Sequence, residues 1–369
     1  MKKILIISHW FYPRQNPRAF RAFELYRKLK RKYDVDVLIG DYKVKLDSSQ
    51  SYHNLDKYDK ASAYNKNARL SNMKIVQYGL RVVQYFIGER YLLTSGSFIS
   101  SNINLANYNV VISIALPFYV HWLVARKLRK YKGQIVSIAD CGDPFYGTPC
   151  NKMARYISNI QKFVFDTFNY IVIPTSVAMD YYKKFTNDSN KIKVIPQGFD
   201  FSEVVLSDYV PHDVPHFAYA GIFYMDKRNP EKFLQFLSSL ETDFIFTIYT
   251  ITHGAIYQNI LLKYKQVLGE KLIIKDIIPR LECIKQLSQN DFLINMDNIS
   301  STQIPSKIID YTLSKRPILS FDQNNIPAEK FKDFLQGNYE RALTIPIGSF
   351  DINNVASQFE RLFDGGKND

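Results

Sequence analysis

Cysteines are few in this sequence, and long apolar runs are missing. Only three of its 369 residues are cysteines, Cys141, Cys150 and Cys283. Their odd number argues against a disulfide framework, and their spacing fits no metal site. Apolar residues nowhere fill the roughly 18 consecutive positions that a membrane-spanning helix needs. We therefore expect a protein of a reducing compartment, without a metal centre and without a transmembrane helix.

A secretory signal is also missing. The N-terminal Met1, Lys2 and Lys3 lead into only four apolar residues at 4–7, and polar residues follow. This run is shorter than the apolar core of a signal peptide and suits the first buried strand of a domain. The sequence thus predicts a cytoplasmic protein, peripheral at most at the inner face of the cell membrane.

Negative charge is scarce in the first half of the chain. Residues 1–200 hold 31 lysines and arginines against 14 acidic residues, a net charge of +17, whereas the remainder carries a net charge of −4. Basic helix ends at 27–32 and 127–132 fit an anionic membrane surface, unless they are simply solvated. Nucleic acid is not a predicted partner, because helix-turn-helix, zinc-finger and RNP-type patterns are missing. The alternative is a lysine-rich chain with no special partner.

The sequence does contain a regular alternation of apolar strands and amphipathic helices. Hydrophobic residues make up 46% of the chain, and its length suggests about two domains. A strand at 3–8, a helix at 18–32 and a strand at 35–39 form the first βαβ unit. The polar segment 41–71 has the composition of a long loop. A second alternation of the same kind begins after Gly198.

Two such arrays predict an α/β protein with two doubly wound, Rossmann-like domains. The first domain is expected at residues 1–200 and the second at 216–345. Residues 201–215, which lack periodicity and contain two prolines, are the expected linker. Residues 346–369 contain an amphipathic helix that we expect to pack back on the first domain. Ligands of such sheets bind at the carboxyl ends of the strands, so a cleft between two facing domains is the expected site.

The segment 304–319 carries the clearest functional signal. An apolar strand at 291–296 precedes it, and a helix is predicted to begin near Ser306 and Lys307. The free N–H groups and the dipole of such a helix N-terminus favour an anion. Asp310 lies about one turn further along the same face, where it can accept a hydrogen bond from a sugar hydroxyl. Phosphate and ribose contacts within one turn predict a nucleotide diphosphate site. Alternatively, Ser306 is only a helix cap and Asp310 only a surface carboxylate.

Five further segments resemble a known family in their order and spacing. They lie at residues 4–13, 110–117, 171–176, 193–200 and 220–231. Over nearly its whole length the chain resembles GT-B-fold glycosyltransferases of the family 4 kind, the retaining, nucleotide-sugar-dependent enzymes of bacterial surface polysaccharides. The resemblance implies transfer of a sugar from a nucleotide diphosphate sugar to a glycan or a lipid-linked, lipopolysaccharide-type saccharide. It also implies that neither a metal nor another cofactor takes part.

In the second domain, the resemblance assigns two cations to the departing diphosphate. Arg228, or its neighbour Lys227, is the candidate from the loop after Gly221, and Lys307 is the candidate from the helix start. Both would stabilise the charge that develops on the leaving oxygen. The alternative for Arg228 is a solvated loop charge. Asp310 matches a family glutamate that binds the nucleotide ribose.

The sequence departs from the family at Thr302. The family has a glutamate at this position, eight residues before the ribose-binding residue, and that glutamate contacts the donor sugar. Thr302 and its neighbour Gln303 can hydrogen-bond a sugar hydroxyl, but neither stabilises a developing positive charge as a carboxylate does. The donor sugar therefore stays open. A non-catalytic glycan-binding or partner subunit of the same fold and a nucleotide-sugar epimerase are the alternative functions.

In the first domain, the candidate acceptor-side residues follow predicted strands. Asp143 would orient or deprotonate the acceptor hydroxyl, unless it only forms an Asp–Pro turn. Arg14 and Arg18 stand at the positive end of a helix dipole, which is unfavourable for a cation unless it binds a phosphate of the donor or the acceptor. His9 either faces the cleft or is a structural histidine. Two further residues, Asp140 and His121, are expected to be structural.

Overall fold

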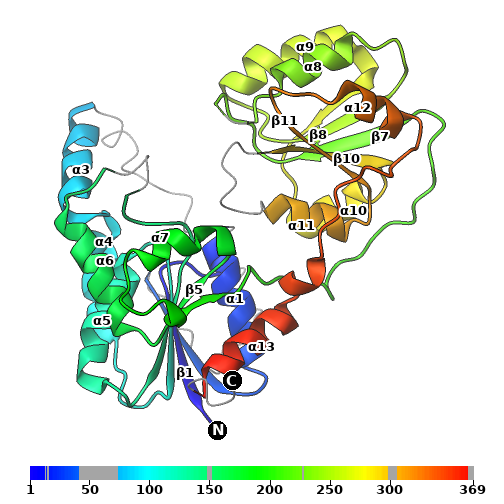
Figure 1. Ribbon diagram of the computed structural model, residues 1–369. Coiled ribbons are helices and arrows are strands. Elements are labelled where there is room, and N and C mark those ends of the chain that lie inside the picture. Colours follow the sequence, from blue (N-terminus) through cyan, green and yellow to red (C-terminus); the bar gives the residue numbers. More distant parts are fainter. Residues whose placement is uncertain are drawn as a thin grey trace. The chain divides into compact units, whose positions relative to one another are not determined.

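The computed structural model describes residues 1–12, 14, 16–40, 74–147, 152–226, 228–297 and 306–364. The chain forms two compact units. Unit 1 comprises Met1–Phe199 together with Ser349–Asp369, and unit 2 comprises Asp200–Gly348. Each unit has one parallel sheet with helices packed on it (Figure 1). The predicted α/β class with two doubly wound domains is confirmed.

The sheet of unit 1 has the strand order β2-β1-β3-β4-β5-β6, and all neighbouring strands run parallel. Its strands are β1 Lys3–Ser8, β2 Asp34–Ile39, β3 Val110–Ile114, β4 Val136–Asp140, β5 Tyr170–Ile173 and β6 Ile192–Val194. The chain steps from β1 to β2 and then returns to β3 on the other side of β1. The point where the strand order reverses therefore lies between β1 and β3, and ligands of such sheets bind at the carboxyl ends of these strands.

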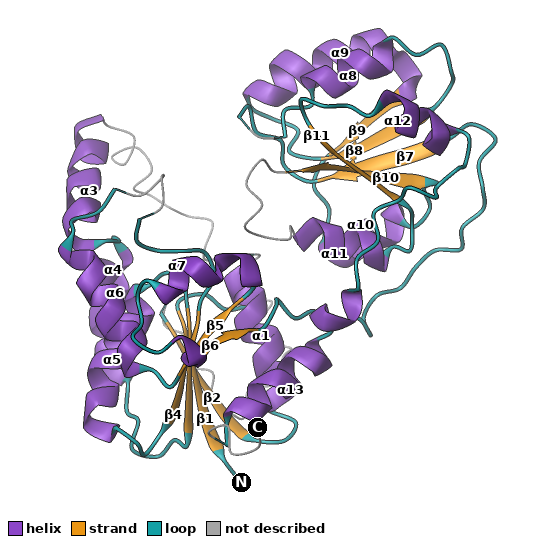
Figure 2. Cartoon of the chain, in the orientation of Figure 1, coloured by secondary structure: helices purple, strands orange, loops and turns teal. Residues whose placement is uncertain are grey.

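Helices cover both faces of this sheet (Figure 2). The helices of unit 1 are α1 Pro17–Leu29, α3 Lys74–Ile87, α4 Tyr91–Asn102, α5 Tyr119–Leu128, α6 Tyr156–Thr167, α7 Met179–Lys183 and α13 Ile352–Leu362, of which α3, in its described residues, does not pack on the sheet. Helix α1 begins after Asn16, whose side chain accepts a hydrogen bond from the backbone N–H of Ala19 (2.9 Å). Its buried Leu25 and Leu29, four residues apart, then face the strands.

The C-terminal helix α13 belongs to unit 1 and lies beside α1 (Figure 1). Gly198 permits its close approach, because a Cβ there would lie only 2.7 Å from Ile352 and 3.1 Å from Val355. Phe359 of α13 packs against the guanidinium of Arg21, 4.8 Å from its ring centroid. The helix thus completes the core of unit 1 after the chain has passed through unit 2.

The sheet of unit 2 has the parallel order β11-β10-β7-β8-β9. Its strands are β7 His216–Ala220, β8 Ile245–Tyr249, β9 Leu272–Lys275, β10 Phe292–Asp297 and β11 Ile318–Asp322. Its helices are α8 Glu231–Ser238, α9 Leu262–Leu268, α10 Arg280–Leu287, α11 Ser306–Leu313 and α12 Ala328–Leu335. A cluster of phenylalanines fills the core. The ring of Phe217 is stacked with those of Phe246 and Phe292, and the ring centroids are 4.8 Å apart in both pairs. The strand order reverses between β7 and β10, so α11 starts beside this point.

Residues 201–215, predicted as a linker, are tied to unit 2. The carboxylate of Asp291, just before β10, accepts hydrogen bonds from the Tyr209 hydroxyl (2.6 Å) and His212 Nδ1 (3.1 Å). It also accepts the backbone N–H of His216 at 2.7 Å. One buried acidic residue therefore holds this segment in place and fixes the start of β7.

Two helices were not predicted from the sequence. Helix α4 lacks a clear apolar period, and α12 has few apolar residues besides Phe331 and Phe334, which are buried. The predicted loop at 41–71 lies outside the described residues. Among the helices that the structure describes, none is both long and apolar enough to cross a membrane.

Candidate functional site

The carboxyl end of β7 in unit 2 presents bare backbone. Gly221 follows the strand with φ = +146°, a conformation that residues with a side chain rarely adopt. A Cβ at this position would also lie 3.3 Å from the hydroxyl oxygen of Tyr219. Glycine is therefore needed here, and a ligand can approach the main chain closely.

Tyr311 docks α11 on the same strand end. Its hydroxyl accepts a hydrogen bond from the backbone N–H of Ala220 (2.7 Å) and lies 3.2 Å from the Ala220 carbonyl oxygen, to which it donates. Tyr311 is fully buried, and burial raises the pKa of its hydroxyl, which stays protonated. Two hydrogen bonds to one residue thus fix α11 against the end of β7.

The two predicted cations of unit 2 meet at Tyr219. Lys307 Nζ lies 4.7 Å from the centroid of the Tyr219 ring and donates to the carbonyl of Met296 at 3.3 Å. The Arg228 guanidinium lies beside the Tyr219 hydroxyl and lowers its pKa, although the larger effect of burial raises it overall. Tyr219 was not predicted as a site residue, because inside an apolar strand it is indistinguishable from core.

Arg228 itself is held in an unusual conformation. Its φ of +74° lies in the left-handed region, which costs an arginine roughly 1 kcal/mol or more. Its guanidinium carbon lies 5.2 Å from the centroid of the Tyr224 ring. Within the described part of the chain, its buried Nε has no hydrogen-bond partner. An anion is the natural partner for such a donor.

Gln323, which directly follows β11, holds the loop that carries Arg228. Its side-chain oxygen accepts the backbone N–H of Asn229 (2.5 Å), and its amide nitrogen donates to the carbonyl of Asp226 (3.3 Å). Asn229 in turn accepts the backbone N–H of Glu231, at the start of α8. The sequence did not single out Gln323, since nothing local connects it to a loop almost a hundred residues earlier.

Asp310 already has a cationic partner. Its Oδ1 lies 2.8 Å from Nε and 2.6 Å from an Nη atom of Arg280, which opens α10. Burial raises the pKa of the Asp310 carboxyl, and Arg280 partly opposes this rise. A ribose hydroxyl would therefore share the carboxylate with Arg280, whose role was not predicted.

Several predicted donor residues fall outside the described part of the chain. These are Lys227, Thr302, Gln303 and the side chain of Ser306, whose backbone begins α11. The donor-side residues that the structure brings together are thus Gly221, Arg228 and Lys307. Within the described residues, no three His, Cys, Asp or Glu side chains gather as a metal site would require.

In unit 1, a buried ion pair organises the carboxyl edge of the sheet. Arg21 of α1 donates from Nε to Asp140 Oδ2 (2.8 Å) at the end of β4, and it also reaches the Pro196 carbonyl (2.5 Å) after β6. Arg21 is only 1% exposed. The pair therefore holds α1 against two strand ends, and Asp140 is structural, as expected.

Arg18 lies one turn earlier and is less well satisfied. Its guanidinium donates to the Ala115 carbonyl and to Gln197 Oε1, both at 3.4 Å. Burial lowers the pKa of Arg18, and Asp140 and Asp143 oppose this effect. Its nearest carboxylate oxygen, Asp140 Oδ2, lies 3.9 Å away, so this partly buried cation can meet a further anionic group at the sheet edge. Exposed positions of the same region carry Asp143 and Arg14.

His9 does not face solvent. It is 2% exposed, its Nδ1 lies 2.7 Å from the Tyr119 hydroxyl, and its ring lies 4.6 Å from that of Tyr91. The assignment of His9 to the acceptor side is therefore corrected, because aromatic rings enclose its imidazole. His121 is buried as well, with Nδ1 2.7 Å from Ser113 Oγ.

A pocket of about 470 Å³ opens at the carboxyl edge of this sheet, and we call it the edge pocket. Its lining comes from the residues after β1, β3 and β4 and from the α3–α4 connection. These include Trp10, Glu89, Arg90, Tyr91, Leu116, Pro117, Pro144 and Phe145. The Glu89 carboxylate accepts the backbone N–H of Tyr119 at the start of α5, and burial raises the pKa of Glu89 to about 7. Sequence reasoning missed Glu89, because nothing local marks it as buried.

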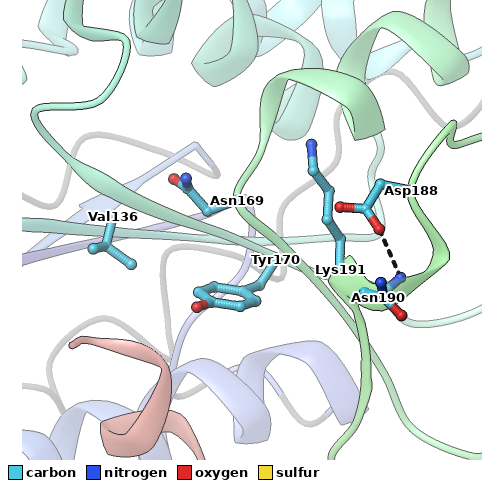
Figure 3. A pocket seen from close by; sticks show the side chains of 6 residues that line it. All are labelled: Val136, Asn169, Tyr170, Asp188, Asn190 and Lys191. Carbon is cyan, nitrogen blue, oxygen red and sulfur yellow. Dashed lines mark hydrogen bonds between the residues drawn. The ribbon is translucent and has the colours of Figure 1, made fainter. Parts of the chain in front are cut away.

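Another pocket, of about 290 Å³, lies at the opposite edge of the same sheet (Figure 3). Val136 and Tyr170 begin β4 and β5, and Lys191 immediately precedes β6. In the figure Asp188 accepts a hydrogen bond from the backbone of Asn190 (2.9 Å). Because parallel sheets bind ligands at their carboxyl ends, this pocket is not the candidate site.

Comparisons with known proteins identify the architecture. No family model and no curated protein matches the sequence. Among solved structures, sucrose-phosphate synthase from Thermosynechococcus elongatus aligns with a TM-score of 0.58 and 11% identity over 99% of both chains. The lipopolysaccharide outer core galactosyltransferase WaaB aligns at 0.55 and 11%, also over 99% of both. HepE from Anabaena, in complex with UDP-glucose, aligns at 0.56 and 8% over 99% of this chain and 100% of HepE.

This chain has the GT-B fold. The similarity extends over both units rather than over a single Rossmann-like domain, since nearly the whole of each chain is matched. Residues at the carboxyl ends of β7 and β10 in unit 2, and of β1, β3 and β4 in unit 1, are then the candidate GT-B site residues.

Proposed function

We propose that this protein is a glycosyltransferase that moves a sugar from a nucleotide diphosphate sugar to a glycan or lipid-linked saccharide. The observation that carries the proposal is the pair of cations at Tyr219, beside the bare backbone of Gly221 and the start of α11. A diphosphate is the ligand whose charge suits two cations and a helix N-terminus. The GT-B fold and the UDP-glucose bound to HepE support the same ligand class.

The proposed reaction breaks the bond between the anomeric carbon and an oxygen of the diphosphate. Negative charge grows on that oxygen, and Arg228 and Lys307 would stabilise it. The acceptor hydroxyl forms the new bond on the same face of the sugar, which gives retention, and its proton passes to the departing phosphate. No protein nucleophile takes part, and the two cations serve instead of a metal or another cofactor.

The remaining donor contacts are proposed from the sequence. Asp310 would bind the ribose while keeping Arg280 as its partner, and Ser306 would contribute the first N–H groups of α11. Thr302 and Gln303 would hydrogen-bond the donor sugar. These assignments predict a site that reads the sugar through neutral groups.

On the acceptor side, Asp143 would orient the acceptor hydroxyl, and Arg18 would bind a phosphate of the donor or the acceptor. The helix end at 27–32 would meet anionic lipid at the inner face of the cell membrane, where each cation contributes roughly 1 kcal/mol. A cytoplasmic enzyme of cell-surface polysaccharide or lipopolysaccharide synthesis fits these features.

Binding of nucleotides to the purified full chain tests the donor site. We expect UDP, GDP, dTDP or CMP, or one of their sugars, to bind by calorimetry, and Arg228→Ala or Lys307→Ala to weaken that binding about 10- to 100-fold. Lys263→Ala is the matched control, because its Nζ also lies over a tyrosine ring, that of Tyr264 at 5.2 Å, but on α9. Equal binding by all variants would sink the proposal.

Turnover separates the alternatives. A non-catalytic subunit would bind the nucleotide but neither hydrolyse nor transfer any sugar of a donor panel. Thr302, which stands where the family has a glutamate, favours this second candidate. An epimerase would return an isomerised nucleotide sugar without an acceptor. A transferase would release nucleotide in proportion to the acceptor supplied.

A further inference from the structure

Another pocket in unit 1 adjoins the edge pocket. This apolar pocket of about 210 Å³ lies between α3, α4, α5 and α6. Its lining includes Phe86, Ile87, Leu92, Trp122, Tyr156 and Ile160. Glu89 and Phe145 line both pockets, so the two pockets are adjacent at these side chains. The apolar pocket among the helices is therefore an immediate neighbour of the edge pocket.

The edge pocket suits a polar and anionic group. Trp10 and Tyr91 are in edge-to-face contact at 5.8 Å and offer ring surface to a saccharide. Arg90, which is exposed, lies with its guanidinium carbon 5.5 Å from the Tyr91 ring centroid and can reach a phosphate or carboxylate at the pocket mouth.

The apolar pocket suits a hydrocarbon chain. Its rim leaves large rings uncovered, with Phe86 53% exposed and Tyr156 48% exposed. Apart from Glu89, its lining offers only aliphatic and aromatic side chains. Burial raises the pKa of Glu89 to about 7, which lets this carboxyl be uncharged beside hydrocarbon near neutral pH.

We propose that the two pockets together bind one amphiphilic acceptor. Its anionic saccharide or phosphate head occupies the edge pocket beside Trp10 and Arg90, and the first part of its single hydrocarbon chain occupies the apolar pocket beside Trp122. The proposal rests on the proposed function only in that the head carries the hydroxyl that accepts the sugar. The adjacency of the pockets and the charge of Arg90 select this occupant over a purely apolar one.

The chain contains only two tryptophans, and each lines one of the pockets. Trp10→Phe leaves Trp122 as the reporter of the apolar pocket, and Trp122→Phe leaves Trp10 as the reporter of the edge pocket. The emission of each variant is followed as the full chain is titrated, without donor, with decyl phosphate below its micellar concentration. Inorganic phosphate and decanol are titrated in parallel.

We expect decyl phosphate to change the emission of Trp10 and of Trp122 with the same dissociation constant. Inorganic phosphate should change only Trp10, and decanol only Trp122, each at a higher concentration. If decyl phosphate leaves either tryptophan unchanged, or if the two respond at different concentrations, one molecule does not bridge the pockets and the proposal is wrong.

A matched pair of substitutions tests the location. Phe86→Gln removes an exposed ring of the apolar pocket and should weaken decyl phosphate binding about tenfold or more. Leu93→Gln is the control, because Leu93 is 61% exposed but lines neither pocket, and it should leave binding unchanged. Equal loss in both variants would show a general apolar surface instead of a pocket.

Vesicles separate a bound amphiphile from a membrane surface. Anionic vesicles of phosphatidylglycerol and phosphatidylcholine should change the emission of Trp122 less than decyl phosphate does. The proposal would be overturned if vesicles caused the larger change in emission and if Phe86→Gln and Leu93→Gln reduced that change equally. Nucleotide binding to unit 2 is measured in the same variants. If the protein binds nucleotide but not decyl phosphate, this inference is refuted and the proposed function is not. Loss of nucleotide binding in Arg228→Ala has no bearing on this inference.

Discussion

Glu89 is predicted to destabilise unit 1 above neutral pH. Burial raises its pKa from the ordinary 4.5 to about 7, although the backbone N–H groups of Tyr119 and Phe118 hydrogen-bond its carboxylate. Nearby polar groups are engaged elsewhere: the Arg90 guanidinium lies over the Tyr91 ring, and the Tyr119 hydroxyl contacts His9. The folded state must therefore ionise an acid that water would solvate better.

The sign follows from proton binding. Between pH 4.5 and 7 the folded state holds the Glu89 proton and the unfolded state does not, so this group lowers stability as pH rises through that window. Above pH 7 the cost is complete, at about 3 kcal/mol for a pKa difference of this size. Below the unfolded pKa the cost vanishes.

Glu89→Gln removes the charge and keeps an oxygen that can accept the N–H of Tyr119. We expect the variant to be about 2–3 kcal/mol more stable than the wild type at pH 8 and equally stable at pH 4. Urea unfolding followed by tryptophan fluorescence measures this, because both tryptophans lie in unit 1. Asp180→Asn, an exposed acid of α7, is the control and should show no such trend.

A difference between Glu89→Gln and wild type that is constant over pH would refute the reasoning, since it would place the Glu89 pKa at its ordinary value in the folded state. A less stable variant at pH 8 would mean that the carboxylate is stabilised at its place between α3 and α4. Either outcome would also remove the support that an uncharged Glu89 lends to a hydrocarbon beside it.

Three further predictions concern other buried groups. Burial lowers the pKa of His121 to about 3, so unit 1 should lose stability as pH falls below about 6.5. The loss should reach about 3 kcal/mol at pH 4. Urea unfolding followed by tryptophan fluorescence measures this trend, which His121→Gln should flatten. Tyr311→Phe should cost about 1–3 kcal/mol, because the N–H of Ala220 loses its partner, and calorimetry should show weaker nucleotide binding as α11 loosens. The pKa of Asp291 is lowered in the folded state, so the stability that this carboxylate contributes to the fold is complete above about pH 4 and is lost as pH falls further. Asp291→Ala should make the segment 201–215 susceptible to limited proteolysis at neutral pH.

Contrary results would be equally clear. If His121→Gln loses stability at acid pH as the wild type does, groups other than His121 cause that loss. Tyr311→Phe with unchanged stability would mean that water replaces the hydroxyl at the end of β7. An intact segment in Asp291→Ala would show that the other contacts of residues 201–215 suffice to hold it.

The positions of three site residues could be predicted from the sequence, but their contacts could not. Lys307 was predicted because a helix start after a buried strand is a local pattern, and the structure places it there. His9 was assigned to the acceptor side from its position after a strand, but Tyr119, more than a hundred residues later, encloses it. Asp310 lies where the pattern placed it, yet its partner Arg280 comes from the preceding helix.

The sequence by itself predicted the two doubly wound domains, most of their strands and helices in order along the chain, and the carboxyl edge of the sheets as the place for a ligand. These follow from apolar periodicity and from the geometry of βαβ units, which are local properties. Only the tertiary structure decided which side chains meet. Two contacts, Arg21–Asp140 and Arg228–Tyr219, join segments that are distant in the sequence, and the burial of Glu89 also depends on distant segments. No local pattern predicts them, because packing across a sheet brings together residues from many parts of the chain.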